Sequence, residues 1–158
     1  MEEWIIRLVQ SKFAWPKLFE ALWMSWDAAK PVLGRVLLVM VGGSLGAVCR
    51  YGTSLLAAQW IGTRFPWGTL IVNLTGCFVI GVSFALAERT NLMGPSARLF
   101  FMTGFLGALT TFSTFALETV NALRGGTLLV AAMNLLINNA IGFGLVVLGM
   151  WLVRLIRA

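Results

Sequence analysis

The sequence GFLGALTTFSTFALE, residues 104–118, combines an apolar composition with glycines at its start and hydroxyl side chains in its middle. Glycine lowers helix propensity, and serine and threonine hydroxyls compete for backbone hydrogen bonds, so the stretch predicts a membrane-spanning helix that is broken near residues 107–110. In a membrane, irregular backbone survives only where protein buries it or where it lines a cavity, and its freed carbonyl groups can coordinate a cation. Phe112 and Phe115 are three residues apart and share one helical face. This mixture of rings and hydroxyls favours a pore wall, with aromatic packing between helices as the alternative.

The rest of the chain has the composition of a membrane protein. Of its 158 residues, 59% are hydrophobic and 11% are charged, against roughly a quarter charged in an average soluble domain. Four long stretches carry almost no charge, namely 36–61, 65–87, 99–117 and 125–153. Each is near the ~20 residues that a helix needs to cross a ~30 Å hydrocarbon core. The predicted fold is therefore an all-α membrane protein with four transmembrane helices.

The composition also argues against two other classes of protein. The sequence contains no histidine, which removes the commonest general base and metal ligand, so an enzyme is not expected. The net charge of +6 is explained by basic residues that meet anionic headgroups of the lipid bilayer. We therefore expect no nucleic-acid partner.

Residues 1–30 predict an N-terminal extension to a transmembrane domain that comprises residues 31–158. Charged residues interrupt the extension too often for a span, but its aromatic and leucine side chains recur at helical spacing between Trp15 and Trp26. Pro16 suits the first turn of a helix. We expect an amphipathic helix that lies in the membrane interface, with a partner-binding helix as the alternative.

The basic residues also predict how the chain is oriented. With four spans, both termini and the 88–98 loop share one side of the membrane, which carries nine lysines and arginines, whereas the opposite side carries only Arg64 and Arg124. The nine are Arg7, Lys12, Lys17, Lys30, Arg35, Arg89, Arg98, Arg154 and Arg157. This imbalance favours a cytoplasmic location for both termini.

The first span contains the sequence GGSLGAVCRY, residues 42–51. Its small residues, above all Gly42, Gly43 and Gly46, predict close contact with another helix, because small side chains let backbones approach each other within a membrane. Arg50 is costly inside a span unless it faces a water-filled cavity or extends to the interface. A cavity arginine would attract an anion, and a snorkelling arginine is the alternative.

Amide side chains recur in the second and fourth spans. Thr69 and Asn73 are four residues apart and share a face of the second span, and Asn134 and Asn138 do the same in the fourth. Amides inside a bilayer either hydrogen-bond across helices or line a polar path. We expect the amides of the fourth span to extend the polar path that Asn73 indicates.

Three sequence blocks, in this order, resemble the small fluoride channels of the Fluc or CrcB family. They are GGSLGAVCRY at 42–51, GTLIVNLTGCFVIG at 68–81 and GFLGALTTFSTF at 104–115. The string TTFSTF on a glycine-rich third span is the most specific of the three, and the resemblance covers about residues 36–153. It implies an antiparallel, dual-topology homodimer in a bacterial inner membrane, with two pores along the subunit interface and a broken third helix. The charge imbalance leaves an oppositely oriented paralogous subunit as the alternative partner.

The resemblance also implies roles for individual residues. Asn73 looks like the pore amide, and Phe112 and Phe115 look like the aromatic pair of the pore. Arg50 looks like a vestibule arginine, and Glu118 matches an acidic position near the mouth of the pore. The full set of side chains that we expect to line the pore or bind fluoride is Thr69, Asn73, Phe112, Ser113, Thr114, Phe115, Asn134 and Asn138.

A structural sodium ion is the one cofactor that the resemblance implies. The backbone carbonyls of Gly107 and Thr110, two from each subunit, match the positions that hold sodium at the centre of the dimer. Ala108 stands where the family usually repeats glycine.

The function expected on these grounds is passive export of fluoride through a selective channel, which lowers its concentration in the cytoplasm. The alternative is a small four-helix, proton-coupled multidrug exporter, which requires a carboxylate deep in the membrane. Only Glu88 and Glu118 are candidates for that carboxylate, and both lie at the ends of spans.

Overall fold

The computed structural model describes the backbone of residues 15–90 and 93–156, and side chains from residue 31 onward within those ranges. Residues 1–14 of the expected N-terminal extension therefore lie outside the described residues. The chain divides into two compact units, Met1–Val36 and Leu37–Ala158. The described part of the first unit is the N-terminal part of helix α2.

Helix α2 (Trp15–Trp60) contains both the described part of the extension and the first span. Pro16 is its second residue, as expected for a proline in a first helical turn. Pro31 lies inside the helix, so the boundary that the sequence suggests at residue 30 is not a helix end. A proline costs one backbone hydrogen bond, and α2 continues through it.

Four helical stretches are long and apolar enough to cross a membrane, which confirms the four predicted spans. They are Pro31–Trp60, Trp67–Arg89, Pro95–Arg124 and Leu128–Ile156. Within the described residues every regular element is helical, so the chain is an all-α membrane protein. The ends of these stretches differ from those of the predicted spans by between one and seven residues, and the second and fourth begin later than predicted because the 61–66 and 125–127 loops precede them.

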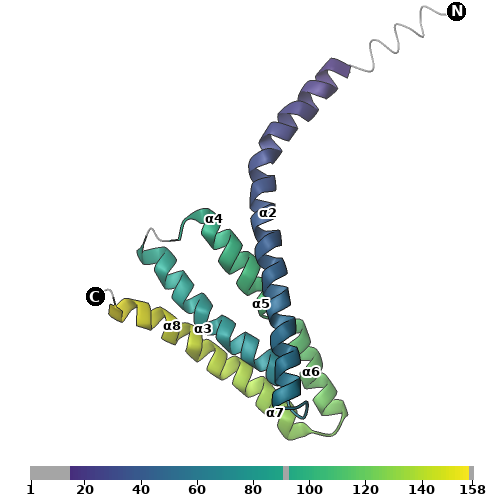
Figure 1. Cartoon of the computed structure of the whole chain (residues 1–158), viewed down its shortest axis with the longest axis vertical. Helices are drawn as coiled ribbons and strands as arrows, with labels where there is room; N and C mark the ends of the chain where they lie inside the picture. Colours follow the sequence, from purple (N-terminus) through teal and green to yellow (C-terminus); the bar gives the residue numbers. More distant parts are fainter. Residues whose placement is uncertain (1–14, 91–92, 157–158) are drawn as a thin grey trace, which may run out of the picture. The chain divides into compact units, whose positions relative to one another are not determined.

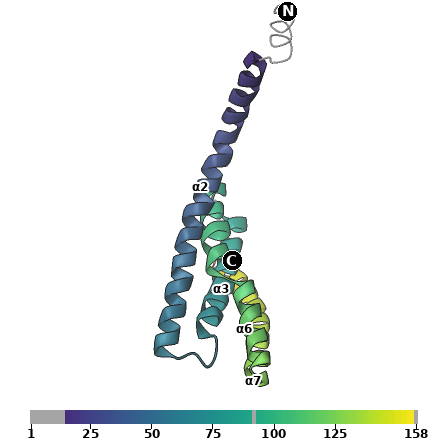
Figure 2. The same cartoon turned by 90° about the vertical axis from the view of Figure 1, so that its right-hand side faces the viewer.

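The second span is a single helix, whereas the third and fourth are built from several segments. The second is α3 (Trp67–Arg89), which follows α2 through the 61–66 loop (Figure 2). The third consists of α4 (Pro95–Arg98), the π-helical η1 (Leu99–Leu106), α5 (Gly107–Leu109) and α6 (Phe112–Arg124). The fourth consists of α7 (Leu128–Leu136), the π-helical η2 (Ile137–Ile141) and α8 (Gly142–Ile156).

Glycines allow two pairs of elements to pack backbone against backbone. A Cβ on Gly42 or Gly46 of α2 would fall against a carbonyl oxygen of η1, that of Phe100 or Phe105 respectively. This contact confirms the close approach predicted from the small residues of the first span. Gly81 of α3 and Gly149 of α8 do the same for α3 and α8, which run side by side in Figure 1.

A small apolar core lies where α3 meets the third span. Val72 of α3, Leu106 of η1 and Leu109 of α5 are buried together. Phe101 and Phe105 pack against them, with their rings stacked 5.6 Å apart. This packing holds α5 on α3 at the point where the third span stops being helical.

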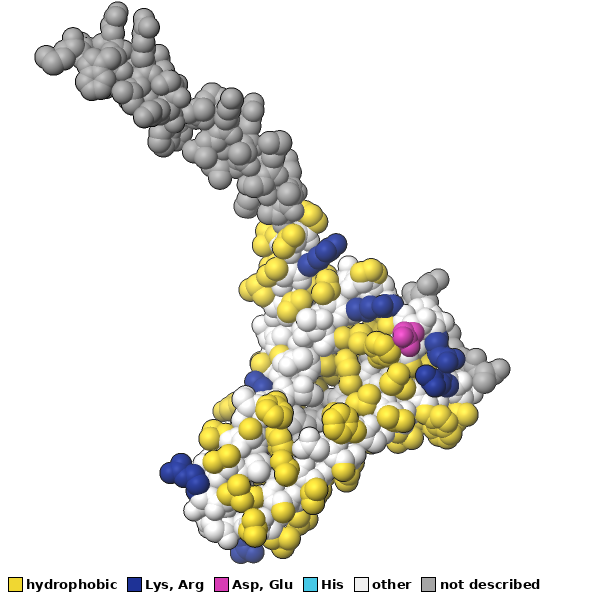
Figure 3. All heavy atoms as spheres, turned by 180° about the vertical axis from the view of Figure 1, so that it is seen from behind, with side chains coloured by type: hydrophobic (Ala, Val, Ile, Leu, Met, Phe, Trp, Pro, Cys, Tyr) yellow, Lys and Arg dark blue, Asp and Glu magenta, His cyan; other side chains and the backbone are white. Residues whose placement is uncertain are grey.

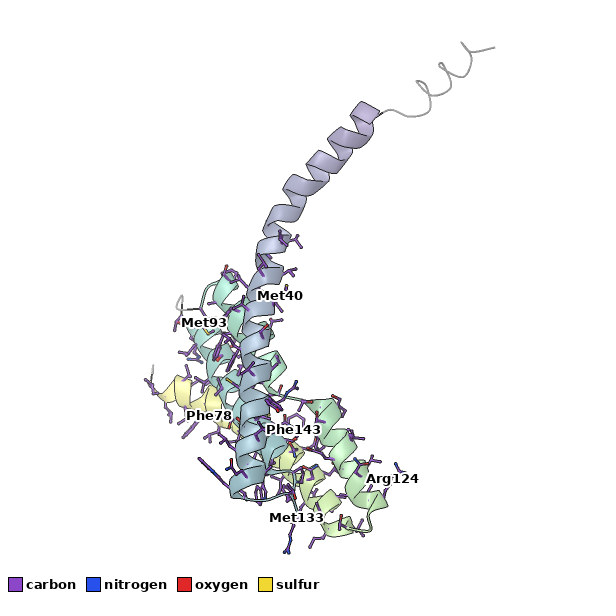
Figure 4. All side chains as sticks on the ribbon, turned by 45° about the vertical axis from the view of Figure 1, so that its right-hand side comes forward. Met40, Phe78, Met93, Arg124, Met133 and Phe143 are labelled. Carbon is purple, nitrogen blue, oxygen red and sulfur yellow. The ribbon has the colours of Figure 1, made fainter. Side chains whose placement is uncertain are left out.

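The remaining surface suits a lipid environment. Hydrophobic side chains extend along the helices on the face drawn in Figure 3, and most basic side chains lie toward helix ends. Helices α6 and α7 form a hairpin through residues 125–127, and Figure 4 labels Arg124 and Met133 on its two sides. Arg124 is thus a terminal residue of the third span, in keeping with its predicted place outside the hydrocarbon core.

Candidate functional site

The third span leaves the helical conformation at Thr110 and Thr111. Both residues are extended, with φ −83° and ψ 156° at Thr110 and φ −151° and ψ 117° at Thr111. Helix α5 ends at Leu109 and α6 begins at Phe112, so the interruption lies at the C-terminal edge of the 107–110 stretch that the sequence indicates.

Asn73 of α3 satisfies the backbone groups that this interruption exposes. The backbone N–H of Thr111 donates to Asn73 Oδ1 at 2.9 Å, and Asn73 Nδ2 donates to the carbonyl oxygen of Thr111 at 3.3 Å. In an unbroken helix the same N–H would donate to the carbonyl of Gly107. The amide of Asn73 therefore replaces part of the helical hydrogen bonding and leaves that carbonyl without its usual donor.

Thr111 also begins the next helix, as its N-cap. Its Oγ1 accepts a hydrogen bond from the backbone N–H of Thr114 at 3.3 Å and donates to Thr114 Oγ1 at 3.0 Å, and Ser113 Oγ lies 3.5 Å away. Ser113 and Thr114 are exposed, and neither lines the cavities described below. Thr111 is not among the site residues predicted from the sequence, although a threonine directly before a new helical stretch is a recognisable capping signal.

A cavity of about 400 Å³ opens beside the interruption. Four of the expected pore side chains line it, namely Asn73, Phe112, Phe115 and Asn138. The rings of Phe112 and Phe115 lie 5.6 Å apart and are tilted by 58°. Gly107 and Thr110 line the same cavity, so the amides, the ring pair and the irregular backbone of the third span share one space. We call it the central cavity.

The amides of the second and fourth spans are joined by hydrogen bonds. Asn73 Nδ2 donates to Asn138 Oδ1 at 2.9 Å, and Asn138 Nδ2 donates to Asn134 Oδ1 at 2.9 Å. Asn134 Nδ2 in turn donates to Thr119 Oγ1 of α6 at 2.9 Å. Asn134 is only 1% exposed and does not line the central cavity, whereas Asn73 and Asn138 do.

A second cavity, also of about 400 Å³, contains two more of the expected residues, Thr69 and Glu118. Thr69 Oγ1 donates to Glu118 Oε1 at 2.8 Å. Glu118 Oε2 is buried and has no hydrogen-bond partner among the described residues. Arg64 from the 61–66 loop lines the same space, so this second cavity has one acidic and one basic side chain on its wall.

Arg50, the predicted vestibule arginine, lies outside both cavities. It is half-buried on α2, and it belongs to the lining of neither the central cavity nor the second cavity. The arginine that does line the second cavity is Arg64, which was predicted only to lie on the less basic side of the membrane. Its position in a loop between two spans was the available clue, because binding residues are disproportionately found on loops that a rigid scaffold positions.

The backbone of the third span fits a small, hard cation. Gly107 and Thr110 both line the central cavity, and the donor that a continuous helix would give to the Gly107 carbonyl is bonded to Asn73 instead. Carbonyl oxygens of unwound membrane helices are ligands of the type that sodium takes. The residues present are therefore compatible with the sodium site that the resemblance implies.

A family model and several similar proteins of known name match most of this chain. Residues 37–150 match the family model described as CrcB-like protein, Camphor Resistance (CrcB). A protein of Shewanella amazonensis named "Fluoride-specific ion channel FluC" is 46% identical over 121 residues, which are 77% of this chain and 97% of that protein. Proteins with the same name from Salinibacter ruber and Dehalococcoides mccartyi are 44% and 40% identical, over 73% and 79% of this chain and 86% and 96% of their own lengths. The chain spans the membrane with the same helical stretches that carry this match, and it belongs to the CrcB-like family.

Proposed function

We propose that this chain forms a channel that conducts fluoride passively across a bacterial inner membrane and so lowers fluoride in the cytoplasm. The observation that carries the proposal is the central cavity, where the amides of Asn73 and Asn138 meet the rings of Phe112 and Phe115 beside an interrupted span. The names of the similar proteins support fluoride as the ion. Fluoride that enters acidified cells as neutral HF would leave down its own electrochemical gradient.

The mechanism follows from the chemistry of the ion. Fluoride is small and strongly hydrated, so a selective path must replace its water with donors at short range and must be too narrow for chloride. The positive edges of the phenyl rings are weak donors, and weak donors suit conduction because an ion that is bound too tightly cannot leave. Phe112 lines the cavity and is 78% exposed, so its ring is accessible to an ion.

The amides have a different part in this mechanism. Asn73 uses both N–H groups of its side chain inside the protein, one on Thr111 and one on Asn138. An ion that reaches Asn73 would therefore take the place of one of these two acceptors, of which the Thr111 carbonyl, at 3.3 Å, is the more distant. Because the donor is already oriented, this exchange replaces one acceptor by another without rebuilding the site.

The proposed assembly is an antiparallel homodimer, with an oppositely oriented paralogous subunit as the alternative. Support comes from the resemblance and from the exposed ring of Phe112, which one copy alone leaves facing away from its own core. A second copy in the opposite orientation would supply a wall for the open side of each central cavity. It would also bring two more carbonyl groups to Gly107 and Thr110, so that four oxygens hold one sodium ion. The ion would supply positive charge that fixes the two interrupted spans together.

The test is anion efflux from liposomes that contain only this purified chain. With potassium inside and valinomycin added, fluoride efflux is expected to be fast, and chloride efflux under the same conditions is expected to stay at the level of protein-free liposomes. A protein that releases neither ion, or both at equal rates, would contradict the proposal. Fluoride movement that requires a proton gradient would support the coupled exporter instead.

A further inference from the structure

Hydrogen bonds join three amides of the second and fourth spans to two threonines of the third span. Two members of this chain, Asn134 and Thr119, lie outside the central cavity. Its links run head to tail: Thr111 N–H to Asn73 Oδ1, Asn73 Nδ2 to Asn138 Oδ1, Asn138 Nδ2 to Asn134 Oδ1, and Asn134 Nδ2 to Thr119 Oγ1. The donor–acceptor distance is 2.9 Å in each of the four hydrogen bonds. We call these four side chains and the Thr111 backbone the amide chain.

Each link of the amide chain fixes the orientation of the next. An amide has one accepting oxygen and two N–H donors, so the bond at one end decides which way the group faces. Asn138 uses both of its N–H donors on Asn134, one on its Oδ1 at 2.9 Å and one on its backbone carbonyl at 3.0 Å. Its oxygen is thereby left pointing to Asn73, where it accepts at 2.9 Å.

The far end of the chain is anchored in the interior. Asn134 is 1% exposed, and its Nδ2 donates both to Thr119 Oγ1 at 2.9 Å and, more weakly, to the carbonyl of Phe115 at 3.5 Å. Neither Asn134 nor Thr119 lines the central cavity. Buried amides in a membrane are retained only when paired, and here the pairing links α6 and α7 to the interruption of the third span.

We propose that Asn134 and Thr119 are positioning residues of the fluoride path, which act through Asn138 on the amide of Asn73 and on the interruption at Thr111. The inference rests on the proposed function. It assigns Asn134 a role different from the pore-lining one that its place in the sequence suggests. The side chain that meets the ion is Asn73, and the buried half of the chain decides how Asn73 is presented.

The decisive variant is Thr119→Val, which keeps the shape of the side chain and removes the acceptor for Asn134. Fluoride efflux is expected to fall roughly three- to fifteen-fold, the range of one interhelical hydrogen bond in a membrane protein, and Thr119→Ser is expected to restore it. The matched control is Thr53→Val, because Thr53 Oγ1 donates to the carbonyl one turn earlier in α2, as Thr119 Oγ1 does in α6. Efflux through the control should equal that of the wild type.

A double variant separates this route from a direct effect on Phe115, to whose carbonyl Thr119 also donates at 2.8 Å. In an Asn138→Ala background the link to Asn73 is absent, so adding Thr119→Val should cause no further loss of efflux. If the two losses multiply, or if Thr119→Val alone conducts like the wild type, the proposal is wrong.

A measurement without transport completes the test and covers the case in which Asn138→Ala fails to fold. In the ¹⁵N-labelled protein, Thr119→Val should shift the side-chain NH₂ resonances of Asn134, Asn138 and Asn73, and Thr53→Val should leave all three unchanged. An Asn73 resonance that does not move in Thr119→Val would overturn the amide chain as a route. This readout does not depend on whether fluoride is the permeant ion, so its failure is distinct from failure of the proposed function.

Discussion

The rings of Phe112 and Phe115 lie 5.6 Å apart with a tilt of 58°, yet Phe112 is 78% exposed and Phe115 only 5%. Both side chains line the central cavity. One ring is therefore available to the open side of the cavity, and the other is part of the packing of α6. The sequence suggests the same role for both phenylalanines, but in the structure Phe112 provides accessible ring surface and Phe115 is held in the protein interior.

This difference predicts that isoleucine has separate effects at the two positions. Phe112→Ile should slow fluoride efflux from liposomes strongly while the free energy of unfolding changes by less than about 0.5 kcal/mol, because the exposed ring packs little. Phe115→Ile should slow efflux and also lower the free energy of unfolding by roughly 0.5–3 kcal/mol, because the ring is buried. Efflux and unfolding in detergent measure the two effects.

Phe84→Ile is the matched control, since Phe84 of α3 is exposed and lines neither cavity. It should leave efflux unchanged. Wild-type efflux through Phe112→Ile would remove that ring from the fluoride path.

Gly46 and Gly52 of α2 allow a test of the close packing between α2 and η1. A Cβ at Gly46 would meet the carbonyl oxygen of Phe105, which is backbone and cannot rotate away, whereas a Cβ at Gly52 meets nothing within 4 Å. Gly46→Ala should therefore lower the thermal unfolding temperature, at a cost of about 1–3 kcal/mol. Gly52→Ala should be neutral or stabilise the helix by up to about 1 kcal/mol. Equal unfolding temperatures for the two variants would show that α2 and η1 can separate slightly without loss.

The spans and the close glycine contact of α2 were predictable because they depend on local properties. A charge-free stretch of sufficient length specifies a membrane helix whatever its neighbours are. Small residues one turn apart specify a surface that admits another backbone, as Gly42 and Gly46 do. Neither property specifies which helix packs against the surface, so the contact between α2 and η1 could not be predicted from the sequence.

The distribution of polar side chains among the cavities was not predictable in the same way. Thr69 and Asn73 share a face of α3, yet Thr69 bonds Glu118 in the second cavity and Asn73 bonds Thr111 beside the central cavity. Helical spacing gives the face but not the neighbour that each turn meets. Asn134 illustrates the same limit. Its four-residue spacing from Asn138 does not indicate that Asn134 is buried whereas Asn138 lines the central cavity.

The proposed sodium site predicts a dependence on the cation present. The Gly107 and Thr110 carbonyls beside the interruption suit a small ion, so replacing sodium on both sides of the liposome membrane by a larger monovalent cation such as N-methylglucamine should reduce fluoride efflux. Return of sodium should restore it. Efflux that is indifferent to the exchange, after dialysis long enough to remove bound sodium, would contradict a structural role for the ion.

The N-terminal extension is predicted to be dispensable for conduction. The family match begins at residue 37, and the similar protein of Shewanella amazonensis is covered over 97% of its length by 121 residues of this chain. Deleting residues 1–30 would start the chain close to Pro31, and proline is well suited to the first turn of a helix because its missing N–H has no intrahelical partner there. The shortened protein should therefore fold and release fluoride from liposomes at a rate within about twofold of the full chain. Unfolding in detergent serves as the control for folding, and a shortened protein that folds like the full chain but does not conduct would show that the extension takes part in transport.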